Sequence, residues 1–244
     1  MRNSWGDLRH VLKDSSCLTF PFPAFPKLAM SATHLSGLSL GNIPITGYIS
    51  PKAMASCLAT LPSLEWLSIK FQSPQSRPDR IGLPPLTRAV LPTLADFTFQ
   101  GVNEYLEDLV ARIDTPKLIR LRIHFFMDLM FHIPQLHKFI VRAENIRPLN
   151  PAKITFSSSY IDIILGPLTS AVELRINCRE PDWQALSMAQ LCSQLSPLLS
   201  HVEQLNVREF MRGQARQGMS STPRSGSTFL IPFSPCNICI YMTS

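Results

Sequence analysis

A short motif recurs along this chain and limits the folds that it can adopt. It reads proline, any residue, leucine, two further residues, and then two apolar residues separated by one position, as in the stretch 62–69. Further copies, the last three of them without the proline, occupy residues 92–99, 116–123, 134–141, 35–40, 171–176 and 202–207. A motif that returns this often is typical of a repeat architecture, in which neighbouring copies share one continuous core.

Each copy of the motif predicts one short strand. Its last residues alternate between apolar and polar, which is the period of a half-buried strand, and its proline ends any preceding helix. The predicted strands centre on residues 38, 67, 97, 121, 139, 174 and 205. Their spacing runs from 18 residues (121 to 139) to 35 residues (139 to 174), around the period of about 20–29 residues of leucine-rich repeats.

These strands predict an α/β fold, an irregular leucine-rich-repeat-like solenoid with a parallel sheet on its concave face. A regular repeat also carries an asparagine or cysteine after the strand. That position holds Ile43, Gln72, Val102, Phe126, Glu144, Arg179 and Phe210 here, so we expect the turns to differ from one repeat to the next.

Several further elements are predicted between the strands. Ser50-Pro51 favours a helix over residues 53–58, and Asn103 is expected to cap a helix that ends at Ile113. That helix should turn Leu106, Leu109, Val110 and Ile113 inward and Glu104, Glu107, Asp108 and Arg112 outward. Residues 154–163 suggest a hairpin, residues 72–92 an exposed proline-rich loop, and residues 183–195 a helix capped by Asp182.

We divide the chain into a solenoid over residues 1–209 and a tail over residues 210–244. Glycine, serine, arginine and glutamine dominate Arg212 to Ser227, which predicts disorder, and the apolar end that follows carries no repeat motif. Neither end carries the polar capping repeat that solenoids normally have, so we expect a truncated or aberrant gene product as one alternative.

Composition limits the cellular context and the chemistry. The six cysteines have no disulfide-framework spacing, no signal peptide is recognisable, and no stretch reaches the roughly 18 apolar residues of a membrane span. We therefore expect a cytoplasmic or nuclear protein that does not enter a membrane. The stretch 37–41 matches the nucleophile-elbow motif, but Ser39 falls inside a predicted strand, whereas an elbow needs a strand-to-helix turn.

The metal-binding alternatives are also weak. Cys236 and Cys239 form a lone pair without the second pair that a zinc site needs, and His124, His132 and His137 lack the spacing of a metalloprotease motif. The sequence therefore predicts no enzyme activity, no catalytic residue, no cofactor and no bound metal.

A further set of motifs occupies residues 47–54, 76–79, 101–113, 125–126, 134–136 and 178–184. By these motifs the chain resembles, over residues 5–209, the leucine-rich-repeat region of the F-box protein family of mushroom-forming fungi. The resemblance implies a substrate-recognition role in a ubiquitin-ligase receptor. The family's F-box, which would contact a Skp-type adaptor, is absent from this sequence, so ligase components are expected as partners only if an upstream F-box exists.

A basic surface is predicted on the concave face. Seven of the 21 outward strand positions are lysine or arginine and two are acidic, so the face carries +5 of the chain's net +6. We predict that this face binds an acidic protein target, through Trp66, Lys70, Arg120, Arg122, His124, Lys138, Arg142, Arg175 and Arg208. Exchange of Arg120 and Arg142 for glutamate is expected to leave the fold nearly intact and to abolish binding.

Three alternatives to this prediction stay open. Nucleic-acid binding through the same face is disfavoured because Trp66 is its one aromatic side chain, whereas such surfaces usually interleave several aromatic residues with the cations. The charges could instead belong to a solvated face without a partner, since lysine and arginine are mostly exposed in any protein. The chain could also be a non-functional gene fragment.

Overall fold

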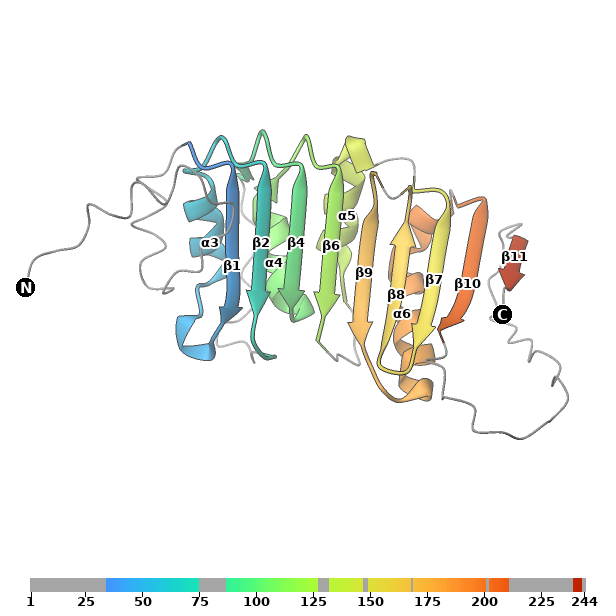
Figure 1. The fold of residues 1–244 in the computed structure, drawn as a ribbon. Helices are drawn as coiled ribbons and strands as arrows, with labels where there is room; N and C mark the ends of the chain where they lie inside the picture. The colour runs from blue at the N-terminus through green and yellow to red at the C-terminus, as the bar shows by residue number, and fades with distance from the viewer. Residues whose placement is uncertain are drawn as a thin grey trace, which may run out of the picture.

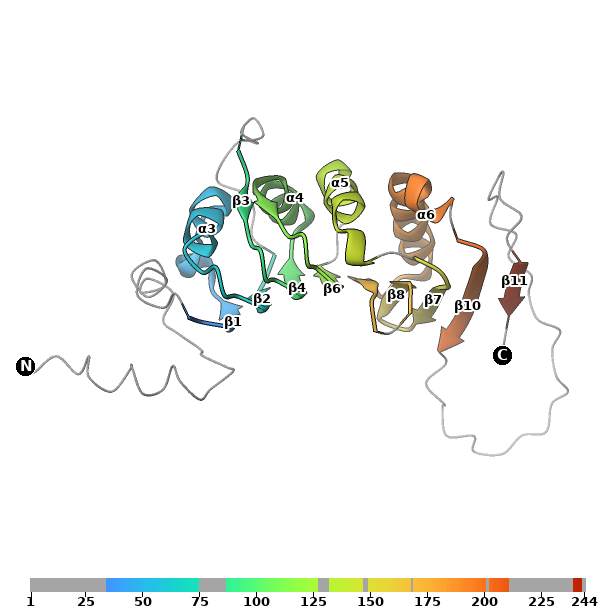
Figure 2. The same cartoon turned by 90° about the horizontal axis from the view of Figure 1, so that it is seen from above.

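The computed structural model describes residues 34–74, 87–126, 132–146, 149–167, 169–200, 202–210 and 239–242. These residues form two layers, a nine-stranded sheet and a row of helices that all lie on one side of it (Figures 1 and 2). The helices are α3 (Pro51–Leu58), α4 (Asn103–Arg112), α5 (Pro134–Arg142) and α6 (Pro181–Leu199), with 3-10 turns η2 (Ile45–Gly47) and η3 (Glu144–Ile146). None of the described helices is long and apolar enough to cross a membrane.

The sheet is mostly parallel. In spatial order its strands are β1 (Gly37–Ile43), β2 (Trp66–Phe71), β4 (Asp96–Gly101), β6 (Arg120–Phe125), β9 (Val172–Asn177), β8 (Tyr160–Leu165), β7 (Ala152–Ser157), β10 (Gln204–Phe210) and β11 (Cys239–Met242). Only β8 runs antiparallel to its neighbours. A separate parallel pair joins β3 (Ala89–Val90) to β5 (Ile113–Asp114). The predicted α/β class is confirmed, and the predicted parallel sheet is confirmed in part, since β8 is antiparallel.

Three successive copies of the motif form three adjacent strands in matching register. Leu67 of β2 lies beside Phe97 of β4, and Phe97 lies beside Leu121 of β6. All three side chains are fully buried between the sheet and the helices. The leucine that precedes each strand, as at Leu64 and Leu94, is equally buried and anchors the turn that leads into the strand.

Two elements match their predictions closely. Helix α3 begins at Pro51, and the side chain of Ser50 accepts a hydrogen bond of 3.3 Å from the backbone N–H of Ala53, as an N-cap does. Strands β7 and β8 form the predicted antiparallel hairpin.

The helices after α3 depart from their predictions at their ends. Helix α4 keeps the predicted buried face, but Asn103 is its first helical residue and Val102 occupies the N-cap position without a side-chain hydrogen bond. Helix α6 is longer than predicted, and Asp182 lies inside its first turn while Glu180 holds the N-cap position.

The predicted strand at 134–141 is wrong, because these residues form helix α5. The genuine copies place a polar residue between the two apolar ones, as Ser68, Thr98 and Arg122 do, whereas this copy places Ile140 there. Leu136, Phe139 and Ile140 then share the spacing of a helix face, and all three are buried. A proline at the first helical position also favours a helix start.

The carboxyl group of Glu107 on α4 supports the start of α5. Its two oxygens accept hydrogen bonds of 2.7 Å from the backbone N–H groups of Gln135 and Leu136. The first N–H groups of a helix have no partner inside the helix, so this contact satisfies two of them. Glu107 is thus half-buried against its neighbour helix, and the prediction that it points outward is wrong.

The tail and the proline-rich loop are described only in part. Residues 1–33, 75–86 and 211–238 lie outside the described residues, and they include the predicted disorder of 212–227 and most of the loop. Within the described parts, Ala89–Val90 of the loop forms β3. Residues 239–242 add β11 beside β10, a strand that no repeat motif indicates.

Truncation of Leu121 should destabilise the protein by about 2–5 kcal/mol, because its neighbours Phe97 and Val172 are fixed in adjacent strands and cannot fill the cavity. Thermal and urea unfolding of Leu121→Ala would measure this cost. Ile119→Ala is the control, because that side chain lies two residues earlier and is 41% exposed. Equal unfolding free energies for both variants would contradict the role of Leu121 in the core.

The free energy of unfolding should fall as the pH rises to 7 and above, because the carboxyl group of Glu107 loses its proton in this range. Burial raises the pKa of Glu107 from 4.5 to about 7, against the opposing effect of the hydrogen bonds from Gln135 and Leu136 and of the charge of Lys138. A raised pKa in the folded state means that the protonated form fits the fold best. Its contribution is therefore complete below about pH 4.5 and lost as the pH passes 7.

The Glu107→Gln variant isolates this effect because the amide does not titrate and can still accept a hydrogen bond. Between pH 5 and pH 8 we expect the wild type to lose up to about 2 kcal/mol relative to the variant, allowing for partial solvent screening. Urea unfolding across that range measures the difference. If the unfolding free energies of the wild type and the variant change equally with pH, the titration of Glu107 does not affect the stability of the fold.

Candidate functional site

The face of the sheet opposite the helices is the candidate functional site, and we call it the open face. No described helix covers it (Figure 2). In the eight neighbouring strands of the main sheet that run from β1 across to β10, alternate residues point to this face while the others enter the core. Its residues are Gly37, Ser39, Gly41, Trp66, Ser68, Lys70, Asp96, Thr98, Gln100, Arg120, Arg122, His124, Glu173, Arg175, Asn177, Tyr160, Asp162, Ile164, Lys153, Thr155, Ser157, Gln204, Asn206 and Arg208.

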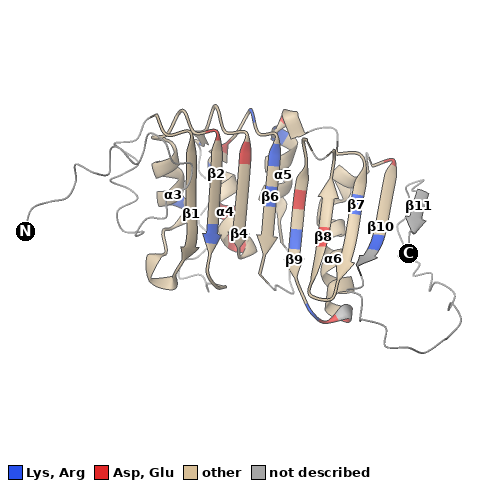
Figure 3. Cartoon of the chain, in the orientation of Figure 1, with Lys and Arg blue, Asp and Glu red and all other residues tan. Residues whose placement is uncertain are grey.

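Strand register places one row of polar residues side by side near the carboxyl ends of the parallel strands. We call it the lower row, and in the order of the strands from β2 to β10 it consists of Lys70, Gln100, His124, Arg175, Asp162, Thr155 and Arg208. Figure 3 shows its cations on β2, β9 and β10.

The centre of the open face is held by ion pairs that cross from strand to strand. Asp96 on β4 accepts hydrogen bonds from both arginines of β6, at 3.1 Å from Arg120 and 3.4 Å from Arg122. Arg122 also lies 3.7 Å from the carboxylate of Glu173 on β9. Three strands are therefore linked by one chain of alternating charges, in which the two carboxylates balance the positive charge of the two arginines.

A second ion pair links β9 to β8. Both carboxylate oxygens of Asp162 accept hydrogen bonds from Arg175, at 2.6 and 2.8 Å, and these bonds raise the pKa of the Arg175 guanidinium. The same guanidinium lies over the ring of Tyr160, 4.4 Å from its centre. A bidentate pair that also stacks on an aromatic ring holds the arginine in one orientation.

Three cations of the open face are left without such a partner. The face holds six basic residues and three acidic ones, and each acidic residue belongs to one of the ion pairs above. Among the described side chains, no carboxylate lies within ion-pair distance of Lys70, Lys153 or Arg208. Charge available to a ligand is thus concentrated on these three residues.

His124 lies between these charges on β6. Its pKa is lowered, first by partial burial, then by the neighbouring guanidinium of Arg175 and, more weakly, by Lys70 and Arg122, while Asp162 opposes them. The imidazole is therefore neutral at pH 7, and it lies where three cations act together.

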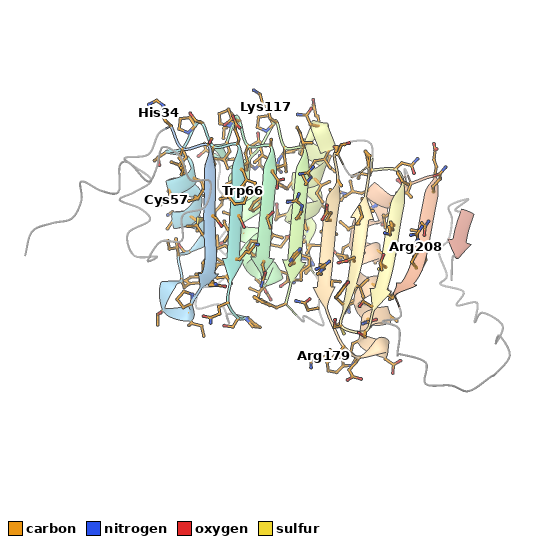
Figure 4. All side chains as sticks on the ribbon, viewed as in Figure 1. His34, Cys57, Trp66, Lys117, Arg179 and Arg208 are labelled. Carbon is orange, nitrogen blue, oxygen red and sulfur yellow. The ribbon has the colours of Figure 1, made fainter. Side chains whose placement is uncertain are left out.

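Trp66 gives the open face an apolar spot near β1. Its indole lies against Gly37 of the neighbouring strand, where an added Cβ would come 3.4 Å from the ring. Figure 4 labels Trp66 on β2 and Arg208 on β10, on the same face of the sheet. The glycine thus leaves room for the indole to lie on the sheet.

Seven of the nine predicted binding residues lie on the open face. They are Trp66, Lys70, Arg120, Arg122, His124, Arg175 and Arg208. Lys138 and Arg142 do not, because the segment that carries them is helix α5 on the other side of the sheet. The predicted adjacency of Arg120, Arg122, Lys138 and Arg142 is therefore wrong.

Arg142 has a structural contact instead. Its guanidinium donates to the carbonyl groups of Val110 and Ile113, at 3.3 and 3.5 Å, and lies 3.4 Å from Asp114. These carbonyls belong to the end of α4, where backbone acceptors lack intrahelical partners and a positive charge is favourable.

The prediction from sequence missed the part of the open face that the hairpin adds. Lys153, Tyr160 and Asp162 come from β7 and β8, which were assigned no place in the repeat series. The signal was available in the alternation of Ile154-Thr155-Phe156 and Ile161-Asp162-Ile163, whose polar middle residues match those of the other strands.

The described residues offer little for other kinds of chemistry. They contain no group of three or more histidine, cysteine or acidic side chains placed to hold a metal ion. Ser39 lies inside β1 between buried Leu38 and Leu40, so it is not at a strand-to-helix turn. Cys192 is a free thiol whose pKa burial raises to about 12, which makes it a poor nucleophile.

Comparison of the chain with protein-family models, with characterised proteins and with solved structures gave no match.

Charge reversal at Arg142 should destabilise the fold, in contrast to the expectation from sequence. A glutamate there would face Asp114 and the carbonyl end of α4, and we expect a loss of about 1–3 kcal/mol. Lys117→Glu makes the same charge change on an exposed turn and should cost within about 0.5 kcal/mol. Equal urea midpoints for the two variants would refute the capping role of Arg142.

Proposed function

We propose that this chain is an irregular leucine-rich-repeat-type solenoid that serves as a non-catalytic protein-interaction scaffold, and that its open face binds an acidic segment of a protein partner. The observation that carries the proposal is that two cations of the lower row form no ion pair with a described carboxylate. Lys70 and Arg208 lie on the same face of one continuous sheet, without a carboxylate partner among the described side chains.

The uncovered, polar character of the open face supports a binding role for it. A parallel sheet is normally covered on both sides, because its strands are joined by helices that pack on it. Here the described helices lie on one side, and polar side chains occupy the other. Such a surface is stable in water without a partner and still presents charges at fixed spacings, which favours recognition by complementary charge.

The resemblance of the repeats to the fungal F-box family narrows the proposed role. By that resemblance, the scaffold would present a substrate to a ubiquitin ligase. Contacts with ligase components would need an F-box upstream of the repeats, whereas the open face would contact the substrate alone. The nature of the substrate follows from the charge of the face, which favours glutamate- and aspartate-rich segments.

A direct test is the affinity of the protein for a glutamate-rich peptide at moderate salt. Reversal of both unpaired cations, as Lys70→Glu with Arg208→Glu, should weaken binding at least about tenfold, since each site would repel the peptide. The matched control, Lys52→Glu with Lys117→Glu, changes the net charge equally at exposed positions outside the open face and should bind almost as the wild type does.

Two outcomes would contradict the proposal. Equal losses in both double variants would mean that net charge, and not the open face, attracts the peptide. Tighter binding of a single-stranded oligonucleotide with a steep dependence on salt would assign the face to nucleic acid instead.

A further inference from the structure

The lower row contains three neighbouring side chains that can each donate a hydrogen bond. Lys70, Gln100 and His124 lie on the adjacent strands β2, β4 and β6 in direct register. Neighbouring strands lie about 4.8 Å apart, so the ammonium-bearing and imidazole-bearing residues stand about 10 Å apart with the amide between them. An ammonium group, an amide N–H and an imidazole N–H are all donors suited to a carboxylate.

The acidic groups near this trio are already engaged. Asp162 on β8 is held by both hydrogen bonds of Arg175, and Glu173 on β9 lies against Arg122. Asp96, at the opposite end of β4, pairs with the two arginines of β6. No carboxylate among the described side chains is left to form an ion pair with Lys70.

Partial burial, and after it the cations around the imidazole, make protonation of His124 unfavourable while the site is empty. Lys70 acts on it from β2, Arg122 from its own strand and Arg175 from β9, and only Asp162 on β8 acts in the opposite direction. Gln100 on β4 carries no charge. A carboxylate that arrives among these groups would offset their repulsion and would accept a hydrogen bond from the imidazolium.

We infer that Lys70, Gln100 and His124 form a binding site for a carboxylate side chain of the partner, and that its occupation transfers a proton from solvent to His124. This inference rests on the proposed function and adds a regulation to it. The proton-bound form of the imidazole is favoured more in the complex than in the free protein. By linkage, the affinity therefore rises as the pH falls through the titration range of His124.

The experiment compares dissociation constants at pH 7.5 and pH 5.5 at constant ionic strength. The probe is a synthetic peptide in which glutamate alternates with serine, because glutamate, with a pKa of about 4.3, stays ionised over this range. We expect the wild type to bind at least about fivefold more tightly at pH 5.5, within the limit of about tenfold per pH unit for one linked proton.

Two variants separate the contributions of the site. His124→Gln keeps a hydrogen-bond donor and should retain the affinity at pH 7.5 within about threefold, with a change below about twofold on acidification. Lys70→Gln should lose affinity at both pH values. Glu107, whose pKa burial raises to about 7, is intact in all three proteins, so its effect cancels in the comparison.

A second measurement needs no variant. Heteronuclear NMR of the wild-type histidine rings gives the pKa of His124 directly, and saturation with the peptide should raise it by about one unit, which is the shift that a fivefold change in affinity requires. The other histidines serve as internal controls and should not shift together with it.

The outcomes distinguish this inference from the proposed function. If the peptide binds, Lys70→Gln weakens it, and the wild type and His124→Gln show the same pH dependence, then proton coupling is wrong and the scaffold role stands. If the peptide does not bind, or if Lys70→Gln has no effect at either pH, both the site and the proposed use of the open face are overturned.

Discussion

A ladder of backbone hydrogen bonds between successive turns fixes how the copies of the motif stack. The carbonyl of Ser36 accepts hydrogen bonds from Glu65 and Trp66, the carbonyl of Glu65 accepts them from Ala95 and Asp96, and Ala95 repeats the contact with the copy that follows. Each turn thus sets the starting point of the next strand. Because a shift by one residue would exchange the core face of a strand for its solvent face, this ladder determines which side chains reach the open face.

The helical layer depends on side chains in the way that the sheet depends on its backbone. Helix ends leave N–H and C=O groups without partners, and here a neighbouring element supplies them: Glu107 on α4 holds the start of α5, while Arg142 on α5 holds the end of α4. Arg88, beside β3, donates a further hydrogen bond of 3.3 Å to the carbonyl of Ala111. These three residues therefore connect neighbouring elements of the helical layer.

The sequence alone predicted the strands whose motif has a polar middle residue, because alternation is a local property. The strand prediction failed at 134–141, because Ile140 makes this copy of the motif compatible with a helix as well as with a strand. Only the packing against Glu107 and the core decides between helix and strand. The ion pairs could not be predicted from the sequence, for a different reason. Arg120 and Asp96 are 24 residues apart, and they meet only because the turn ladder places their strands in register.

The ion pairs also set the scale of any ligand that uses the whole open face. They neutralise its centre, so the unpaired cations of the lower row, Lys70 and Arg208, stand at its two ends, six strand-to-strand steps apart. At about 4.8 Å per step this is about 29 Å, which an extended segment of about nine residues spans at 3.3 Å per residue. A single acidic side chain cannot reach both cations. A partner segment that engages both ends must therefore run across the strands and carry its acidic residues well apart, which favours an extended acidic stretch over a compact acidic cluster.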